Sequence, residues 1–314
     1  MRDGGDDLPR GTYVTSAAHA ELVQRLVAAG VAVPATFPPD EHIRMARDAE
    51  AAAPLPPLPD GYEAETVSIS GVGALWVRPG QANPAAVVLY FHGGGYSWMS
   101  AGTHRRVMAR LAEACDAACL GVDYRRSPES KFPAAVEDAV SAYTWLLDQG
   151  TDASQVIISG DSAGGGLAIA ALLAIRDRQL PLPAGAVCFS PWTDLAVTGA
   201  TADTADDPIV SGPALRSMAK AYLGDADPRA PLASPLYADL HGLPPVQVQV
   251  GTRESLLDDS RRFAAKATEA GVETTLVEHP DVIHMWIVFD PDLPESRHSF
   301  DLAGAFARKH IRLS

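Results

Sequence analysis

From about residue 85 to residue 289, short apolar segments alternate with longer segments that have helical character. Residues 87–91, 155–159 and 246–250 are rich in Val and Ile or in alternating Val, which is typical of strands inside a sheet. Residues 167–178 are rich in Ala and Leu, which favours a helix. This alternation predicts an α/β protein with a mostly parallel, doubly wound sheet.

The N-terminal part of the chain follows another pattern. Residues 15–30 have the apolar spacing of a helix, and a Pro-rich connection follows at 54–59. Two segments of alternating polarity, 65–70 and 74–78, predict an antiparallel pair at the edge of the sheet. Residues 196–240 interrupt the later alternation with many Asp, Pro, Ser and Gly, so we expect an insertion there.

Composition limits the classes of protein that fit. A chain of 314 residues, 47% hydrophobic and 20% charged, is long enough for one sizeable α/β core. The net charge of −14 argues against nucleic acid or an anionic membrane as a partner. No apolar run reaches about 18 residues, so we expect no membrane span.

The N-terminal residues and the cysteines indicate where in the cell the protein is expected. The first seven residues lack the basic-then-apolar order of a signal peptide. Cys115, Cys119 and Cys188 are odd in number and have no metal-site spacing. We therefore expect reduced core cysteines in a cytoplasmic protein that binds no metal.

The strongest chemical signal is Gly160-Asp161-Ser162-Ala163-Gly164, which stands between a predicted strand and a predicted helix. A Gly-x-Ser-x-Gly at such a joint forms a sharp turn that exposes the serine oxygen in front of a helix N-terminus. A phosphate-binding loop is the alternative, but it would have Lys before Ser or Thr after its last glycine, and Gly166 precedes Leu167. The pattern favours Ser162 as a nucleophile.

A glycine triplet supports this interpretation. The predicted strand 87–91 leads directly into His92-Gly93-Gly94-Gly95. Taken alone, three glycines are typical of a flexible loop. Before a Gly-x-Ser-x-Gly motif, they indicate unshielded backbone N–H groups that stabilise a tetrahedral oxyanion.

A serine nucleophile needs a base, and in this architecture the base follows the serine and the acid. Five histidines follow it: His241, His279, His284, His298 and His310. His298 and His310 lie in a segment with helical spacing and polar neighbours, and His241 lies in a loop. His284 precedes an apolar run that would place it against the core, so we predict that it is the base and that His279 lies at the surface.

The acid is expected after the predicted strand 246–250, because ligands of open α/β sheets bind at the carboxyl ends of the strands. Glu254, Asp258 and Asp259 are the candidates. Glu254 is nearest to the strand end. Asp258 and Asp259 fall at the start of a predicted helix, where acidic residues are favourable for a structural reason.

Together these motifs resemble the hormone-sensitive-lipase-like branch of the α/β-hydrolases, a bacterial family of small serine esterases. The matching segments are Tyr90-Phe91-His92-Gly93-Gly94-Gly95, Val122-Asp123-Tyr124-Arg125-Arg126-Ser127-Pro128-Glu129, Phe132-Pro133-Ala134-Ala135-Val136-Glu137-Asp138, Gly160-Asp161-Ser162-Ala163-Gly164-Gly165 and Ser190-Pro191-Trp192-Thr193-Asp194-Leu195. The resemblance implies an α/β-hydrolase fold with oxyanion donors at Gly94, Gly95 and Ala163. It also implies an α/β-hydrolase domain over 61–314, a cap insertion at about 196–240, and N-terminal cap helices within 1–60.

The chain departs from the usual family pattern at two places. The family usually has Asp-Pro-Leu at the acid, and this chain has Glu254-Ser255-Leu256. Glu254 is one methylene longer, so its backbone must lie slightly differently to reach the same imidazole. The family usually has His-Gly-Phe at the base, and this chain has His284-Met285-Trp286, a bulkier group that would narrow the pocket.

The sequence therefore predicts a serine carboxylesterase that hydrolyses short- to medium-chain esters of small molecules through an acyl-enzyme, without a cofactor. Trp98, Trp192 and Trp286 are the expected pocket residues. A lactone hydrolase and a small-molecule deacetylase are alternatives on the same triad. A non-catalytic small-molecule receptor is the alternative from another class, and His284, which a plant hormone receptor of this fold has lost, argues against it. Similar esterases often dimerise through a sheet edge, so the resemblance is compatible with a homodimer, but the sequence leaves the oligomeric state open.

Overall fold

The computed structural model describes residues 15–80 and 85–312 and contains one eight-stranded sheet. The strands have the spatial order β1-β2-β4-β3-β5-β6-β7-β8. Only the pairings of β2 with β1 and with β4 are antiparallel. The strands are β1 (Tyr62–Ile69), β2 (Val72–Pro79), β3 (Val87–Phe91), β4 (Ala118–Val122), β5 (Val156–Asp161), β6 (Gly185–Phe189), β7 (Val246–Gly251) and β8 (Thr274–His279). The mostly parallel sheet and its antiparallel edge pair are confirmed, with longer edge strands than the sequence pattern indicated.

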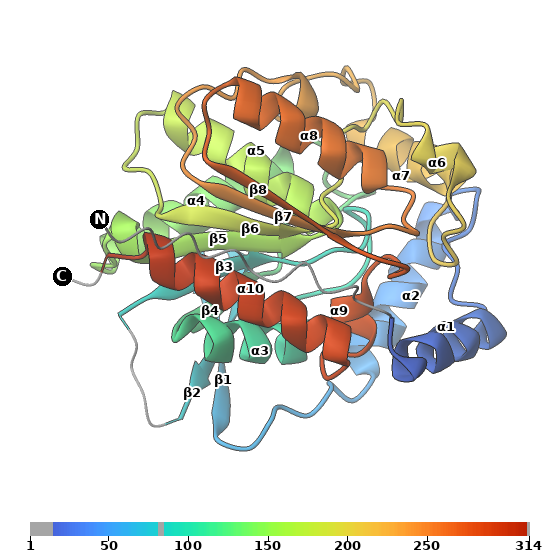
Figure 1. Cartoon of the computed structure of the whole chain (residues 1–314), viewed down its shortest axis with the longest axis horizontal. Helices are drawn as coiled ribbons and strands as arrows, with labels where there is room; N and C mark the ends of the chain where they lie inside the picture. Colours follow the sequence, from blue (N-terminus) through green and yellow to red (C-terminus); the bar gives the residue numbers. More distant parts are fainter. Residues whose placement is uncertain (1–14, 81–84, 313–314) are drawn as a thin grey trace, which may run out of the picture.

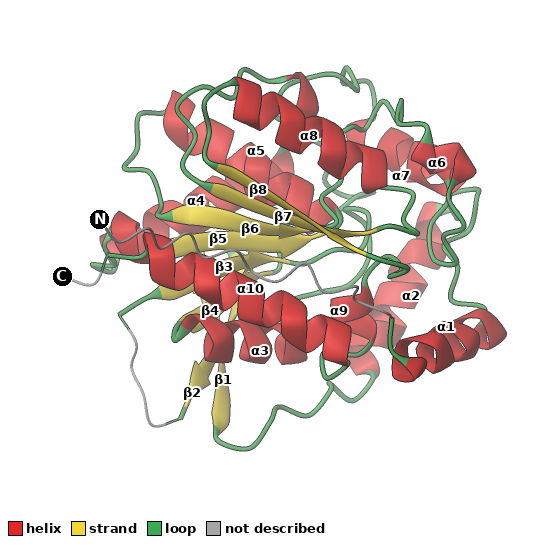
Figure 2. Cartoon of the chain, in the orientation of Figure 1, coloured by secondary structure: helices red, strands yellow, loops and turns green. Residues whose placement is uncertain are grey.

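Helices cover both faces of the sheet (Figure 1, Figure 2). One face carries α3 (Arg105–Cys115), α9 (Trp286–Phe289) and α10 (Pro294–His310), and the other carries α4 (Ala134–Asp148), α5 (Ala163–Asp177) and α8 (Leu257–Glu269). Strands β3 to β7 are buried along their whole length. Two covered faces explain why these strands lack an alternating polar pattern.

The remaining helices gather at one end of the sheet, on the right in Figure 1. They come from the two segments in which a cap was expected: α1 (Ala17–Ala29), α2 (Asp40–Ala52), α6 (Thr201–Thr204) and α7 (Gly212–Leu223). Short 3₁₀ turns, η1 (Ala153–Gln155) and η2 (Pro235–Tyr237), complete the fold. The first fourteen residues of the expected N-terminal cap lie outside the described residues. Within the described part of the chain, no helix is both long and apolar enough to cross a membrane.

The cysteines agree with the sequence expectation, and an ion pair fixes one of the loops near the site. Cys115, Cys119 and Cys188 are buried and carry free thiols. Asp138 of α4 accepts hydrogen bonds from the backbone N–H and the guanidinium of Arg125. This pair fixes the loop after β4, which borders the loop of the glycine triplet.

Candidate active site

Ser162 occupies a sharp turn between β5 and α5. Its backbone has φ 54° and ψ −120°, a conformation that costs a non-glycine residue about 1–3 kcal/mol. The flanking glycines are required by close packing, because a Cβ at Gly164 would overlap the carbonyl oxygen of Phe91 and one at Gly160 would overlap that of Gly164. The Ser162 N–H donates to Phe189 O at 2.9 Å, and the Ser162 carbonyl accepts from Trp192 N at 2.9 Å. These contacts hold the strained turn.

The three residues expected to act together lie in one hydrogen-bonded chain. Ser162 Oγ is 2.9 Å from Nε2 of His284, and Nδ1 of His284 is 2.8 Å from Oε2 of Glu254. All three side chains are buried, with Glu254 fully inaccessible. In such a chain the imidazole can accept the hydroxyl proton while the carboxylate holds its tautomer.

Glu254 is itself held by two donors. Its Oε1 accepts from Ser190 Oγ at 2.7 Å and from the Gly251 N–H at 2.6 Å. Ser190 follows β6 and Gly251 ends β7, so the carboxyl ends of two neighbouring strands fix this carboxylate. The extra methylene of Glu254 is accommodated without loss of a hydrogen bond to His284.

The electrostatics of the site act on His284 in opposite directions. Burial lowers the pKa of His284, but the hydrogen bond to Glu254 and the charges of Glu254, Asp207 and Asp161 raise it, and the net direction is upward. A protonated imidazole at His284 is therefore stabilised in this position.

The loop of the glycine triplet runs beside Ser162. Gly94 and Gly95 have φ values of 101° and 59°, which favour glycine. Across the described residues, no oxygen accepts a hydrogen bond from the N–H groups of Gly94, Gly95 or Ala163. Donors without a partner next to a nucleophile can receive a developing oxyanion.

A buried pair, Asp161 and His104, supports this loop. Asp161 Oδ1 accepts from Gly93 N at 2.9 Å and from the Tyr90 hydroxyl at 2.6 Å, and it lies 3.4 Å from His104 Nε2. Burial raises the pKa of Asp161, but the charge of His104 and the hydrogen bonds from His104 and Tyr90 lower it by more, so the net direction is downward. A carboxylate at this position fixes the direction of the Gly93 N–H and with it the path of the triplet.

A small apolar cavity of about 180 Å³ lies above Ser162 and His284. The two expected cap segments and the loops after β3 and β8 supply its walls. The lining residues are Val31, Val33, Gly94, Gly95, Trp98, Met99, Ser162, Ile209, Val210, Leu215, Met218, His284, Met285 and Phe289. The cavity is smaller than the usual site for a drug-sized ligand, so it fits a short apolar group.

The structure corrects two of the three expected pocket tryptophans. Trp98 lines the cavity, but Trp192 and Trp286 do not. Trp192 is buried and donates from Nε1 to Asp194 O at 3.1 Å, and Trp286 is buried against α10, where Nε1 donates to Ser299 Oγ at 3.3 Å. Met285 occupies the place beside the base that was expected for Trp286.

His279 is also corrected. It was expected at the surface, but only 2% of it is exposed. It is the last residue of β8, and its Nε2 lies 3.0 Å from Oε1 of Gln249 in the neighbouring strand β7. Burial lowers the pKa of His279 to about 4, so it is a neutral core histidine. His298 is exposed, as its segment predicted, whereas His310 of the same segment is half-buried. His241 is exposed in its loop.

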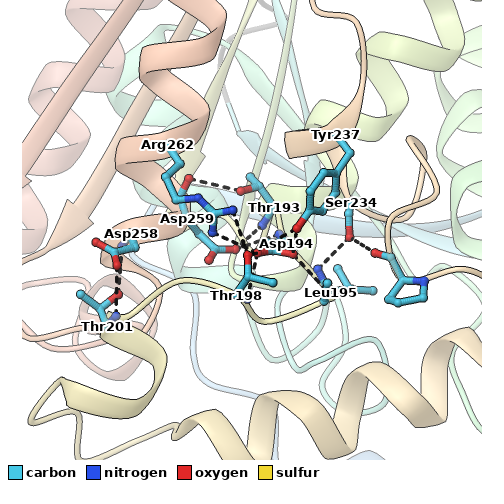
Figure 3. Close-up of polar contacts among 12 residues, drawn as sticks. Thr193, Asp194, Leu195, Thr198, Thr201, Ser234, Tyr237, Asp258, Asp259 and Arg262 are labelled. Atoms are coloured by element: carbon cyan, nitrogen blue, oxygen red, sulfur yellow. Dashed lines mark hydrogen bonds and ion pairs between the residues drawn. The ribbon is translucent and has the colours of Figure 1, made fainter.

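Asp258 and Asp259 lie in the first turn of α8, as predicted, and both bind residues of the segment that follows β6 (Figure 3). Asp258 binds Thr201: Oδ2 accepts from the Thr201 N–H at 3.1 Å, and the Asp258 N–H donates to Thr201 Oγ1 at 3.0 Å. Asp259 is buried, and its Oδ2 accepts from the N–H groups of Thr193 and Asp194 at 2.9 and 2.8 Å. Both connect α8 to the segment that follows β6.

Several residues at the site were not predicted. Ser190 could have been found, because it is a polar residue directly after a buried strand whose carboxyl end meets that of β7. Ile209, Val210, Leu215 and Met218 belong to the insertion, where no local motif marks the residues that face the cavity. Within the described residues, no group of three or more His, Cys, Asp or Glu side chains is arranged to hold a metal ion.

A family model described as the alpha/beta hydrolase fold matches residues 88–288, which include the glycine triplet, the serine turn, Glu254 and His284. The chain belongs to the α/β-hydrolases. A crystal structure of an esterase from the bacterial hormone-sensitive lipase family superposes with a TM-score of 0.86 at 42% identity, covering 96% of this chain and 100% of that one. Within the α/β-hydrolases, the protein is a hormone-sensitive-lipase-like esterase.

Curated relatives point to the same enzyme class. An acetyl-hydrolase from Streptomyces hygroscopicus is 48% identical over 246 residues, which cover 78% of this chain and 82% of that protein. An esterase from Acinetobacter venetianus is 36% identical over 230 residues, which cover 72% of this chain and 76% of that protein. This α/β-hydrolase is a carboxylic ester hydrolase.

Proposed function

We propose that the enzyme hydrolyses short- to medium-chain carboxylic esters of small molecules, with Ser162 as nucleophile, His284 as general base and Glu254 as the acid that orients it. The observation that carries the proposal is the unbroken hydrogen-bonded chain from Ser162 Oγ through His284 to Glu254. A serine of ordinary pKa needs such a chain to attack an ester carbonyl.

The first half of the reaction forms the acyl-enzyme. His284 Nε2 removes the proton of the Ser162 hydroxyl as Oγ attacks the carbonyl carbon, and the carbonyl oxygen becomes an oxyanion. The N–H groups of Gly94, Gly95 and Ala163 receive this oxyanion. The tetrahedral intermediate collapses, the bond to the alcohol oxygen breaks, and His284 returns its proton to the leaving alcohol.

The second half clears the enzyme. A water molecule attacks the acyl carbon while His284 takes one of its protons, and a second oxyanion forms in the same hole. Collapse of that intermediate expels Ser162 Oγ, which regains its proton from His284. Glu254 keeps its charge throughout, because its role is to hold Nδ1 of the imidazole.

The cavity supports the short end of the acyl range. Its volume of about 180 Å³ is below the roughly 300–1,000 Å³ of typical ligand pockets, which favours a small acyl group. The acetyl-hydrolase relative favours small-molecule deacetylation as a second candidate on the same residues. A cytoplasmic location and a homodimer stay predictions.

The test compares hydrolysis of para-nitrophenyl butyrate by the wild type and by Ser162→Ala. We expect kcat/KM to fall by several orders of magnitude, because the nucleophile is lost while the oxyanion donors remain. A fall of less than tenfold in a folded variant would contradict the proposal, and no hydrolysis by the wild type of any ester would favour a receptor.

A further inference from the structure

The loop that carries Glu254 is bound to the insertion. Arg253 Nη2 donates to Asp206 Oδ2 at 2.7 Å, and the hydroxyl of Thr201 donates to Ser255 O at 3.0 Å. Ser255, the residue directly after Glu254, makes two more contacts with the same segment. Segment 201–210 of the insertion therefore contacts the acid's loop on both sides of Glu254.

Asp207 is the centre of these contacts. Its Oδ2 accepts from the Ser255 N–H at 2.9 Å, and its Oδ1 accepts from the Ile209 N–H at 2.9 Å. The hydroxyl of Ser255 donates to Val210 O at 2.7 Å. One carboxylate thus joins the backbone beside Glu254 to the backbone of the insertion.

The contact with Ser255 depends on a departure from the family pattern. The resembled family usually has proline at this position, and proline has neither an N–H nor a hydroxyl. Ser255 supplies both, and both are used. Ser255 also lies next to Glu254, which is one methylene longer than the usual Asp, so the backbone there must lie slightly differently to reach the same imidazole.

We propose that Asp207 is a positioning residue for the ester hydrolysis proposed above: through Ser255 it holds Glu254 against His284. The proposal rests on the proposed function. Asp207 acts through other residues and need not touch the substrate.

The electrostatics agree with this placement. Burial lowers the pKa of His284, and Glu254, Asp207 and Asp161 each raise it. Burial raises the pKa of Asp207, and the charge of Glu254 also raises it. The charge of His284 and the hydrogen bonds from the N–H groups of Ser255 and Ile209 lower it, but the net direction is upward. Three carboxylates on different segments therefore act on one imidazole.

The same short segment also shapes the cavity. Ile209 and Val210 line it, and Ile209 O accepts from Val33 N at 2.7 Å, which connects the N-terminal segment as well. Asp207 therefore couples the position of the cavity wall to the position of the acid. A displaced insertion would disturb Glu254 at the same time.

The test measures the pH dependence of kcat/KM for Asp207→Asn, with Asp206→Asn as the matched control. Both substitutions remove one negative charge from adjacent positions. Among the residues that the structure describes, the side chain of Asp206 pairs with Arg253 alone, and it is 93% exposed, so its charge is screened by solvent. The profile of kcat/KM reports the ionisation of the free enzyme's base.

We expect Asp207→Asn to move the acid limb to lower pH, because loss of the negative charge lowers the pKa of His284. Its plateau value should fall about tenfold, because an amide cannot accept from both N–H donors as the carboxylate does. Asp206→Asn should retain the wild-type acid limb, because the charge that it removes is exposed and screened. Thermal unfolding of each variant at one pH checks that the fold is retained.

An acid limb of Asp207→Asn that coincides with that of the wild type would overturn the proposal, whatever the plateau. The rate of fluorophosphonate labelling at Ser162, measured over the same pH range, reports only folded molecules and gives the same decision if the variant folds poorly. Retained hydrolysis in Ser162→Ala would instead refute the proposed function, so the two failures are distinguishable.

Discussion

Two residues of the site, Ser162 and Glu254, are held in arrangements that cost free energy. Ser162 has a positive φ, and Glu254 is a carboxylate without any exposed surface. Each is stabilised by named partners: the turn by Phe189 and Trp192, and the acid by Ser190 and Gly251. Such costs persist only where neighbouring structure determines the conformation.

At this scale the account distinguishes Glu254 from Asp258. Glu254→Gln should lower kcat by about 10³- to 10⁴-fold with the fold intact, because an amide at this place favours the wrong tautomer of His284. Asp258→Asn should change kcat little, because Asp258 binds Thr201. Steady-state kinetics on one para-nitrophenyl ester make the comparison, and a reversed order would make Asp258 the partner of the base.

The sequence predicted the residues that motifs or strand ends mark and missed those that depend on side-chain direction. Ser162 follows from its motif, and Glu254 follows from its distance to the end of a strand. Trp286 follows the base in sequence by two positions, but it begins α9 and points into the core. Asp207 has no motif, because its role depends on a contact across 48 positions of the chain.

At the scale of elements, the contact between α8 and the segment after β6 carries a buried pair of acids. Asp194 accepts hydrogen bonds from the hydroxyls of Thr198 and Tyr237, and Arg262 of α8 donates to it (Figure 3). Asp259 lies beside Asp194 and accepts hydrogen bonds from the backbone N–H groups of Thr193 and Asp194. Burial and the charge of Asp194 raise the pKa of Asp259 to about 8.

This pair predicts a pH-dependent contribution to stability. Between pH 3.8 and about 8 the folded state keeps the Asp259 proton that the unfolded state loses, so the free energy of unfolding falls as pH rises. Asp259→Asn resembles the neutral form. The Tm of Asp259→Asn minus that of the wild type, measured by calorimetry, should therefore increase from pH 5 to pH 8.

Asp259→Ala is the matched control for this prediction. It leaves the N–H groups of Thr193 and Asp194 without their acceptor, which should make it less stable than Asp259→Asn by about 3 kcal/mol at either pH, because neither variant titrates at this position. A Tm difference between Asp259→Asn and the wild type that is the same at pH 5 and pH 8 would show that Asp259 does not titrate in this range.

Elements were predicted better by type than by extent. The alternation after residue 85 gave the parallel sheet, because fully buried strands leave a continuous apolar pattern. The edge strands are longer than their alternating segments, because β1 continues to pair with β2 where its residues are polar and exposed. Within the insertion, α6 has only four residues and leaves no periodic pattern to detect.

At the scale of the whole molecule, the two expected cap segments close a small cavity over the carboxyl ends of the strands. Met218 of α7 packs directly over Gly95, where an added Cβ would overlap its sulfur. Trp98 and Leu215 supply further bulk. We therefore expect kcat/KM to be highest for esters of about two to eight acyl carbons.

A para-nitrophenyl ester series that includes a sixteen-carbon ester in emulsion measures this preference. Met218→Ala should move the optimum to longer chains, because it removes bulk from the wall without touching Ser162 or His284. A wild-type enzyme that is fastest on the sixteen-carbon ester, or whose rate jumps at the micellar limit of the substrate, would contradict the closed cavity.

The central claim, that Ser162 is the nucleophile, is tested most directly by locating a covalent adduct. The enzyme is titrated with a fluorophosphonate, residual hydrolysis of para-nitrophenyl butyrate is followed, and the labelled peptide is sequenced by mass spectrometry. The account predicts one adduct per chain, on Ser162, with hydrolysis lost in proportion to labelling and no labelling of Ser162→Ala. An adduct on another residue, or hydrolysis that survives complete labelling of Ser162, would contradict it.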